Sequence, residues 1–322
     1  MTDSMIKTSI SGADTADGGE LIRILAMHPE VELVSAQGEG MEGRPLSSFH
    51  HGLIGETDLS FTSRLDTERC DVLFICDRHP DAGEFSRLRR SRPDLKIISL
   101  REVKGIDADE AGMIYGLPEI NRKPLVRGAT AAYLPSPFAS MALVALYPLA
   151  LNLLLDGDIR ISLNAPADIM DDYDTAEAAR EIQGILSGVQ HSFRGDVEIE
   201  ATAGATRRSA LMHISLGCNL DAEHLMSLYG MYDDHNFSFA VRTPVGASEV
   251  AGTDKCVISV GTPADGAVTL DVAADCRLRG GAGEAVHVMN LMCGLHERTG
   301  LALKAIDFNP VDHMAPTPGE EA

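Results

Sequence analysis

The chain has 322 residues, of which 44% are hydrophobic and 23% charged, a balance typical of a soluble globular protein with two modest domains. Its net charge of −21, from 48 acidic and 27 basic residues, argues against nucleic acids and anionic membranes as partners. The six cysteines lack the spacing of metal ligands, so we expect reduced, buried thiols and no metal site.

Neither a membrane span nor a secretory leader is indicated by the hydrophobic pattern. The longest apolar run, at 141–155, is interrupted by Pro148, and residues 1–5 lack the basic and apolar regions of a signal peptide. We therefore expect the protein to be cytoplasmic.

Short apolar segments alternate with helical segments over the first hundred residues. Leu21, Ile24 and Leu25 have the spacing of one helix face, after a glycine-containing turn at 12–19. The alternation predicts an α/β fold with a doubly wound, parallel, Rossmann-like sheet. The expected strands are 6–10, 31–36, 71–76 and 96–100, and the expected helices are 20–28 and 83–90.

The pattern changes after Pro135, where a long apolar helix is predicted and alternating strands follow. This part predicts an antiparallel-rich α+β sheet. The expected strands are 158–163, 196–200, 210–216, 238–241, 256–260 and 267–273, and the expected helices are 138–155, 175–190, 220–232 and 283–294. The proline- and glutamate-containing tail at 309–322 is expected to be disordered.

Three motifs, in order along the chain, share their spacing with one enzyme family. Residues 115–122 read Tyr-Gly-Leu-Pro-Glu-Ile-Asn-Arg, residues 135–140 read Pro-Ser-Pro-Phe-Ala-Ser, and residues 279–292 read Arg-Gly-Gly-Ala-Gly-Glu-Ala-Val-His-Val-Met-Asn-Leu-Met. In these segments the chain resembles the N-acetyl-γ-glutamyl-phosphate reductase family, relatives of aspartate-semialdehyde dehydrogenase and glyceraldehyde-3-phosphate dehydrogenase.

The resemblance implies a domain layout, an assembly and a reaction. A dinucleotide-binding domain would comprise 1–134 and 283–308, and a glyceraldehyde-3-phosphate dehydrogenase-like catalytic and dimerisation domain 135–282. The family forms dimers or tetramers. Its reaction is an NADPH-dependent, phosphate-releasing reduction in arginine biosynthesis: a cysteine attacks an acyl phosphate, hydride reduces the thioester to an aldehyde, and a histidine acts as acid and base.

Both catalytic positions of the family differ in this chain. Its cysteine position is occupied by Pro137, which has no nucleophilic side-chain atom, and its histidine position by Ala178. We interpret Ser136 and Pro137 as the capped start of a helix. The alternative makes Ser136 a substrate-binding or displaced nucleophilic residue, which would require a base and would form an ester, a poorer hydride acceptor than a thioester.

The expected dinucleotide loop is also altered. Gly12 and Gly18 match the family pattern, but Thr15 replaces the glycine between them and is flanked by aspartates. We interpret the loop as a turn capped by an aspartate, in preference to a phosphate site. The resemblance implies NADP, yet Glu39 would repel its 2′-phosphate. Glu39 could instead accept a hydrogen bond from a ribose 2′-hydroxyl, as in NAD-binding folds.

Three further residues match family positions. Arg208 corresponds to a substrate-binding arginine, and Gly283 and Asn290 lie where the cofactor edge is expected. The alternative is that all three serve packing.

The combined differences favour a catalytically inactive family member. Such a pseudoenzyme would act as a homo-oligomer, as a partner of an active reductase, or as a binding or regulatory module. Two alternatives are an active NADPH-dependent reductase with a relocated nucleophile and another NAD(P)-dependent oxidoreductase.

Overall fold

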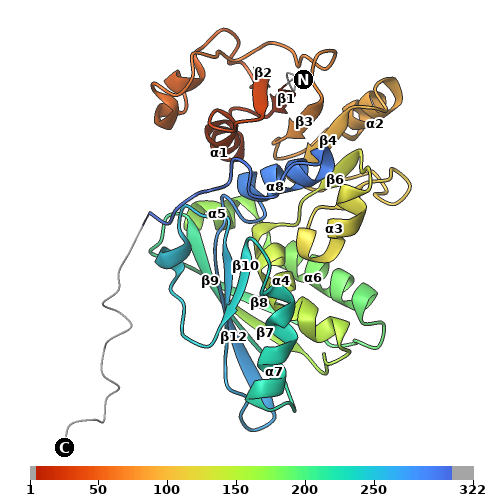
Figure 1. The fold of residues 1–322 in the computed structure, drawn as a ribbon, viewed down its shortest axis with the longest axis vertical. Coiled ribbons are helices and arrows are strands. Elements are labelled where there is room, and N and C mark those ends of the chain that lie inside the picture. The colour runs from red at the N-terminus through yellow and green to blue at the C-terminus, as the bar shows by residue number, and fades with distance from the viewer. Residues whose placement is uncertain (1–4, 307–322) are drawn as a thin grey trace, which may run out of the picture. The chain divides into compact units, whose positions relative to one another are not determined.

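The computed structural model describes residues 5–306, so the tail predicted at 309–322 lies outside the described residues. These residues form two compact units, one made of 5–140 with 276–303 and the other of 141–275 with 304–306. Figure 1 colours the strands of the first unit from red to yellow and those of the second from green to blue.

The first unit is built on a six-stranded sheet in the order β2-β1-β3-β4-β6-β5, and every pair of neighbours is parallel. This confirms the predicted doubly wound sheet. Its strands are β1 (Ile6–Ser11), β2 (Val31–Gln37), β3 (Val72–Ile75), β4 (Lys96–Ser99), β5 (Ile114–Tyr115) and β6 (Ala131–Tyr133). Its helices are α1 (Ala16–Leu25), α2 (Ala82–Ser91), α3 (Pro118–Val126) and α8 (Ala282–Cys293).

The second unit also has a six-stranded sheet, in the order β10-β11-β12-β9-β7-β8. The three central pairs are antiparallel and the outer pair on each side is parallel, which agrees with the antiparallel-rich prediction. Its strands are β7 (Ile159–Ala165), β8 (Val197–Ala203), β9 (Ser209–Gly217), β10 (Ser238–Val241), β11 (Cys256–Val260) and β12 (Ala267–Asp275). Its helices are α5 (Ala167–Asp172), α6 (Thr175–Val189) and α7 (Ala222–Leu228), with a 3-10 turn at Tyr229–Tyr232.

Helix α4 (Pro137–Leu151) is apolar almost throughout and contains Pro148. A proline inside a helix has no N–H, so the carbonyl four residues earlier, that of Val144, loses its helical donor. The hydroxyl of Tyr232 donates to that carbonyl at 2.7 Å, and Val144 is fully buried. The tyrosine therefore satisfies a carbonyl that the proline would otherwise leave unpaired.

Removing the hydroxyl of Tyr232 should lower the free energy of unfolding more than removing the hydroxyl of Tyr229. We expect Tyr232→Phe to lower the free energy of unfolding by about 1–3 kcal/mol, because a buried carbonyl loses its donor. Tyr229 is the matched control: it donates to Ala145 at 2.8 Å, but Leu149, four residues on, keeps its N–H. Urea unfolding of both variants measures the difference, and equal losses would contradict this account of Pro148.

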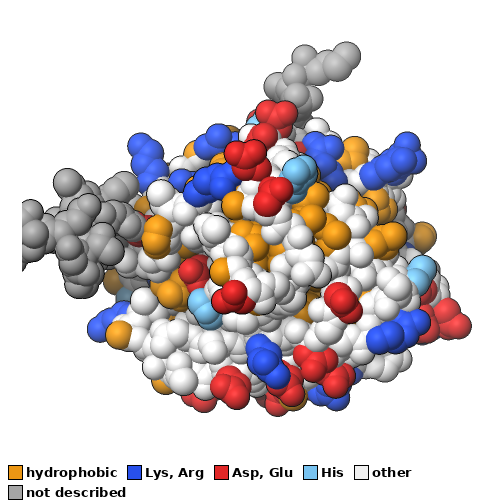
Figure 2. Space-filling model, turned by 90° about the horizontal axis from the view of Figure 1, so that it is seen from below, with side chains coloured by type: hydrophobic (Ala, Val, Ile, Leu, Met, Phe, Trp, Pro, Cys, Tyr) orange, Lys and Arg blue, Asp and Glu red, His pale blue; other side chains and the backbone are white. Residues whose placement is uncertain are grey.

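The surface carries charge of both signs. On the face drawn in Figure 2, acidic side chains lie at several separate places, interspersed with basic side chains and with hydrophobic ones between them. Among residues 5–306, no helix is both long enough and apolar enough to span a bilayer.

Candidate functional site: an acidic pocket and two altered catalytic positions

A pocket of about 480 Å³ lies at the carboxyl ends of β1 and β3. The chain leaves this point toward β2 on one side and toward β4 on the other, and open α/β sheets bind ligands at such a switch point. Three of the residues predicted for cofactor binding, Gly12, Thr15 and Glu39, line it. Gly18, Gly283 and Asn290 are not among its lining residues.

The two matching glycines are required by the backbone of the loop itself. Gly12 has a φ of +69°, and a Cβ there would lie 2.6 Å from the amide nitrogen of Asp77. A Cβ on Gly18 would lie 2.4 Å from the carbonyl oxygen of Gly12. Because these clashes involve backbone atoms, both glycines are needed for the turn whether or not a ligand binds.

Thr15 caps helix α1. Its Oγ1 accepts a hydrogen bond from the N–H of Gly18 at 3.0 Å and donates to the carbonyl of Gly12 at 2.8 Å. The helix consequently begins at Ala16, earlier than the start at Glu20 that the sequence predicts. The self-capped turn is present, but the prediction that an aspartate provides the cap is wrong.

Asp17 serves a different purpose, which the sequence did not reveal. Its side chain is only 5% exposed, with Nη1 of Arg277 3.2 Å from Oδ1 and Nη2 of Arg101 3.5 Å from Oδ2. Two guanidinium groups beside the first turn of α1 are thus paired with a carboxylate of the same chain. No sequence signal joins these residues, since they are brought together from three separate segments.

The rim of the pocket is acidic. Its lining includes five carboxylates and one arginine, Arg78, which gives a formal charge of −4 with His79 neutral. The carboxylates are Asp14, Glu39, Asp77, Asp81 and Glu84. A ligand with several phosphate groups would meet an unfavourable field here.

Pro137 is the first residue of α4, as predicted. The Oγ of Ser136 accepts from the N–H of Ala139 at 3.2 Å, which is the geometry of a helix cap. Gly280, with a φ of +65°, lies against this start so closely that a Cβ on it would be 2.5 Å from the Cα of Pro137. Pro137, the residue predicted at the nucleophile's position, is therefore packed as part of a helix terminus.

A buried ionic cluster that the sequence did not predict surrounds Ser140, which follows Pro137 on α4 by about one turn. Arg279, Glu119 and Glu284 have fully buried side chains, with Arg279 Nη2 2.8 Å from Glu119 Oε1 and Arg279 Nε 3.7 Å from Glu284 Oε2. Ser140, also buried, accepts from Arg279 Nε at 2.7 Å and donates to Glu284 Oε2 at 3.0 Å. The N–H of Gly280 donates to Glu284 Oε2 at 2.6 Å.

Burial and the neighbouring charges of this cluster change the pKa of Glu284. Burial raises the pKa of Glu284 to about 7; Arg279 opposes the rise and the nearby Glu119 adds to it. Glu119, Arg279 and Glu284 all lie in the matched motifs at 115–122 and 279–292, but nothing in the sequence shows that they meet.

Ala178, predicted to occupy the position of the family's histidine, lies on α6 and is buried. Its N–H donates to the carbonyl of Asp174 at 3.0 Å, while the Asp174 side chain caps the helix by accepting from Glu177 N at 2.8 Å. His191, just beyond this helix, is exposed. Ala178 therefore belongs to the first turns of α6, and its side chain provides no group for proton transfer.

Arg208 and Asn290 are held by internal partners. Arg208 Nε lies 2.8 Å from Oδ2 of Asp275, whose side chain is fully buried and also accepts from Gly252 N. Asn290, fully buried, donates to the carbonyls of Glu297 and Thr299 at 3.0 and 2.8 Å. These contacts are those expected of residues that stabilise the fold.

The cysteines offer no replacement nucleophile. All six are free, five are buried, and Cys293 is half-buried. Burial raises the pKa of the Cys76 thiol well above its usual value and that of Cys293 to about 11. Because the thiolate is the nucleophile, these two thiols are poorly suited to attack at neutral pH.

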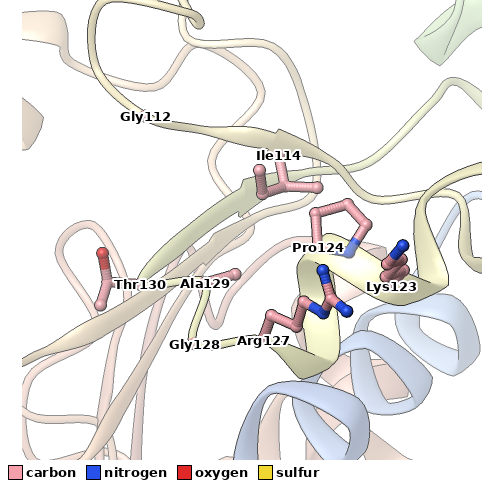
Figure 3. Close-up of a pocket in the computed structure, with 8 residues that line it drawn as sticks. All are labelled: Gly112, Ile114, Lys123, Pro124, Arg127, Gly128, Ala129 and Thr130. Atoms are coloured by element: carbon pink, nitrogen blue, oxygen red, sulfur yellow. The ribbon is translucent and has the colours of Figure 1, made fainter.

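A second pocket, of about 490 Å³, lies beside the edge strand β5 and the end of α3 (Figure 3). Lys123 and Arg127 are its charged residues, and its lining contains no carboxylate, thiol or imidazole. It therefore lacks the groups needed for acid–base or nucleophilic chemistry. In the described part of the chain, no cluster of three or more His, Cys, Asp or Glu side chains is arranged to hold a metal ion.

Comparison with known proteins agrees with these features of sequence and fold. Residues 7–127 match the NAD-binding domain of semialdehyde dehydrogenases. Aspartate semialdehyde dehydrogenase II from Vibrio cholerae has a TM-score of 0.64 with 14% identity, over 90% of this chain and 98% of that one. Aspartate semialdehyde dehydrogenase with NADP from Candida albicans has a TM-score of 0.66 with 14% identity, over 90% of this chain and 99% of that one.

Curated relatives are closer in sequence. The N-acetyl-γ-glutamyl-phosphate reductases of Phocaeicola vulgatus and Bacteroides thetaiotaomicron are each 32% identical to this chain, covering 94% of it and 100% of their own length. Identity of this extent over 94% of the chain shows that it belongs to the N-acetyl-γ-glutamyl-phosphate reductase family.

Proposed function

We propose that this chain is a catalytically inactive member of its family, kept as a folded subunit or binding module. The observation that supports this most strongly is Pro137, the capped first residue of α4, at the position of the family's nucleophile. Without a nucleophilic atom there, no covalent thioester can form. Ala178, at the family's base position, removes proton transfer as well.

The neighbouring serines are poor substitutes. The Ser136 hydroxyl oxygen caps α4, and Ser140 is buried between Arg279 and Glu284. A serine attacks efficiently only when a base within hydrogen-bond distance takes its proton. The carboxylate beside Ser140 belongs to a fully buried cluster, so substrate would not reach that hydroxyl.

Family resemblance supports NADP as the cofactor of the first unit, yet the residues fit it poorly. Thr15 occupies the N–H of Gly18, Asp17 pairs with Arg277 and Arg101, and Glu39 stands exposed at the pocket. Phosphate sites of this fold use free N–H groups and glycines at the helix start. No catalytic step through NADP is therefore assigned to this chain.

The proposed setting is a cytoplasmic oligomer, formed either by copies of this chain or with an active reductase subunit. Membership in a family of oligomeric biosynthetic enzymes supports this assembly. Co-purification from the native cell tests it: recovery with an active reductase supports a mixed assembly. Isolation as a homo-oligomer alone would count against a mixed one.

Activity of the purified chain tests the proposal directly. With N-acetyl-γ-glutamyl phosphate and NADPH, we expect turnover at least ~10⁴-fold below that of an active family member, the order of loss when a covalent nucleophile is removed. NADPH consumption and phosphate release are both measured. Ser136→Ala and Ser140→Ala should leave the residual rate unchanged.

The rival function is an active reductase with a relocated nucleophile, and the 32% identity to proteins named as reductases favours it. Turnover that is abolished by Ser136→Ala would establish that alternative and overturn ours. Turnover abolished by Cys76→Ser would do so as well. Catalysis surviving all these substitutions would indicate a different oxidoreductase site.

A further inference from the structure

We propose that the pocket at the carboxyl ends of β1 and β3 binds a nucleoside through its free ribose hydroxyls and discriminates against each phosphate added to it. Such binding needs neither nucleophile nor base, so it does not depend on whether the chain is catalytically inactive. It also departs from the NADP specificity that family resemblance supports.

The pocket has the size and walls for a nucleoside. Its volume of about 480 Å³ falls within the range of small-molecule sites, roughly 300–1,000 Å³. Apolar side chains contribute to its lining from two elements: Leu73 and Ile75 from β3, and Phe85 and Leu88 from α2. These four side chains are at most 8% exposed and form the buried floor of the pocket. The half-buried Leu65 is the apolar lining residue that can pack against a planar base.

Glu39 provides the polar recognition. It is exposed, lines the pocket and follows the last residue of β2 by two positions, about where nucleotide-binding folds of this kind place a ribose-binding acid. An ionised carboxylate only accepts hydrogen bonds, so it pairs with the two hydroxyl donors of a ribose. The same carboxylate repels a phosphate attached to the 2′ oxygen.

Three groups that would favour phosphate are already engaged, and Arg78, the arginine of the lining, stands against five carboxylates. The N–H of Gly18 is bonded to Thr15, and the guanidinium groups of Arg277 and Arg101 are paired with Asp17. Asp14 and Asp77 contribute carboxylates to the wall of the pocket, near the glycine loop where a pyrophosphate would be expected. The geometry therefore retains a place for the sugar and base but opposes their phosphates.

Calorimetric titration of the full chain with adenosine, NADH and NADPH tests this specificity. We expect adenosine to bind most tightly, with Kd rising about tenfold for NADH and about tenfold again for NADPH, and with the differences shrinking as salt is added. NADPH binding as tightly as NADH would overturn the proposal. So would the failure of all three to bind.

A matched pair of substitutions tests Glu39 itself. Glu39→Gln should weaken adenosine binding. It should also reduce the ratio of the NADPH Kd to the NADH Kd by about tenfold, because it removes the repelling charge while keeping the side chain's shape. Glu56→Gln neutralises another exposed acid that does not line the pocket, and should change neither value. Equal effects of the two substitutions would show that the discrimination between ligands comes from the overall charge of the protein, and would contradict a specific ribose contact.

Discussion

Arg279→Met is expected to be the most damaging single substitution in the first unit, lowering the free energy of unfolding by about 3–5 kcal/mol. The side chains of Arg279, Glu119 and Glu284 are all fully buried. Methionine has a similar volume but no charge, so it would remove the buried positive charge beside the carboxyl groups of Glu119 and Glu284. Urea unfolding at neutral pH measures the loss.

Two comparisons keep this prediction testable. Arg279→Lys retains the charge and should lose less stability, which gives a measurement even if the methionine variant does not fold. Arg160→Met removes an exposed ion pair with Glu198, whose atoms are 4.0 Å apart, and should change stability by less than about 1 kcal/mol. A loss at Arg279 no greater than that at Arg160 would mean that the buried cluster contributes little.

Glu284→Gln is expected to stabilise the protein in a pH-dependent manner. The pKa of Glu284 is about 7 in the folded chain against an ordinary 4.5, so folding favours the protonated acid. Its contribution to stability is complete below pH 4.5 and is lost as pH rises through 7. The full loss is on the order of 3 kcal/mol, and a neutral glutamine avoids it.

The measurement is the free energy of unfolding of both proteins at about pH 5 and about pH 8. We expect a small difference at the lower pH and a clearly more stable glutamine variant at the higher one. Replacing Glu39 by Gln at an exposed site should leave the pH dependence of unfolding nearly unchanged. A stability gain at Glu284 that is the same at both pH values would show that the effect is one of packing and not of charge.

Hydrophobic periodicity was sufficient to predict most of the fold. Strands β10 and β11 have the predicted bounds, and both sheets have the predicted character. The missed elements gave little periodic signal: β5 has two residues, and α3 contains Pro124 and a non-helical Asn121. The expected helix at 220–232 is α7 followed by a 3-10 turn, because the period changes within it.

The candidate site was only partly predictable. Positions matched to a motif, such as Gly12 and Thr15, could be found because local sequence fixes the turn they form. The partners of Asp17 and the cluster around Arg279 could not be found, because Arg277 lies 260 residues from Asp17 and Arg279 lies 139 from Ser140. Long-range charge pairs leave no periodic trace, so the sequence favours a local capping role for the aspartates beside Thr15.

The cysteines described above also bear on how the protein would withstand oxidants. A catalytic cysteine must be an accessible thiolate, and the same property makes it the first residue to be oxidised to sulfenic acid. Pro137 is predicted to take that position here, and burial raises the pKa of the Cys70, Cys76 and Cys293 thiols, which keeps them protonated. Peroxide that inactivates a cysteine-dependent relative should therefore leave these three thiols reduced, so that a complex containing both would lose its catalysis before the buried thiols of this chain are attacked.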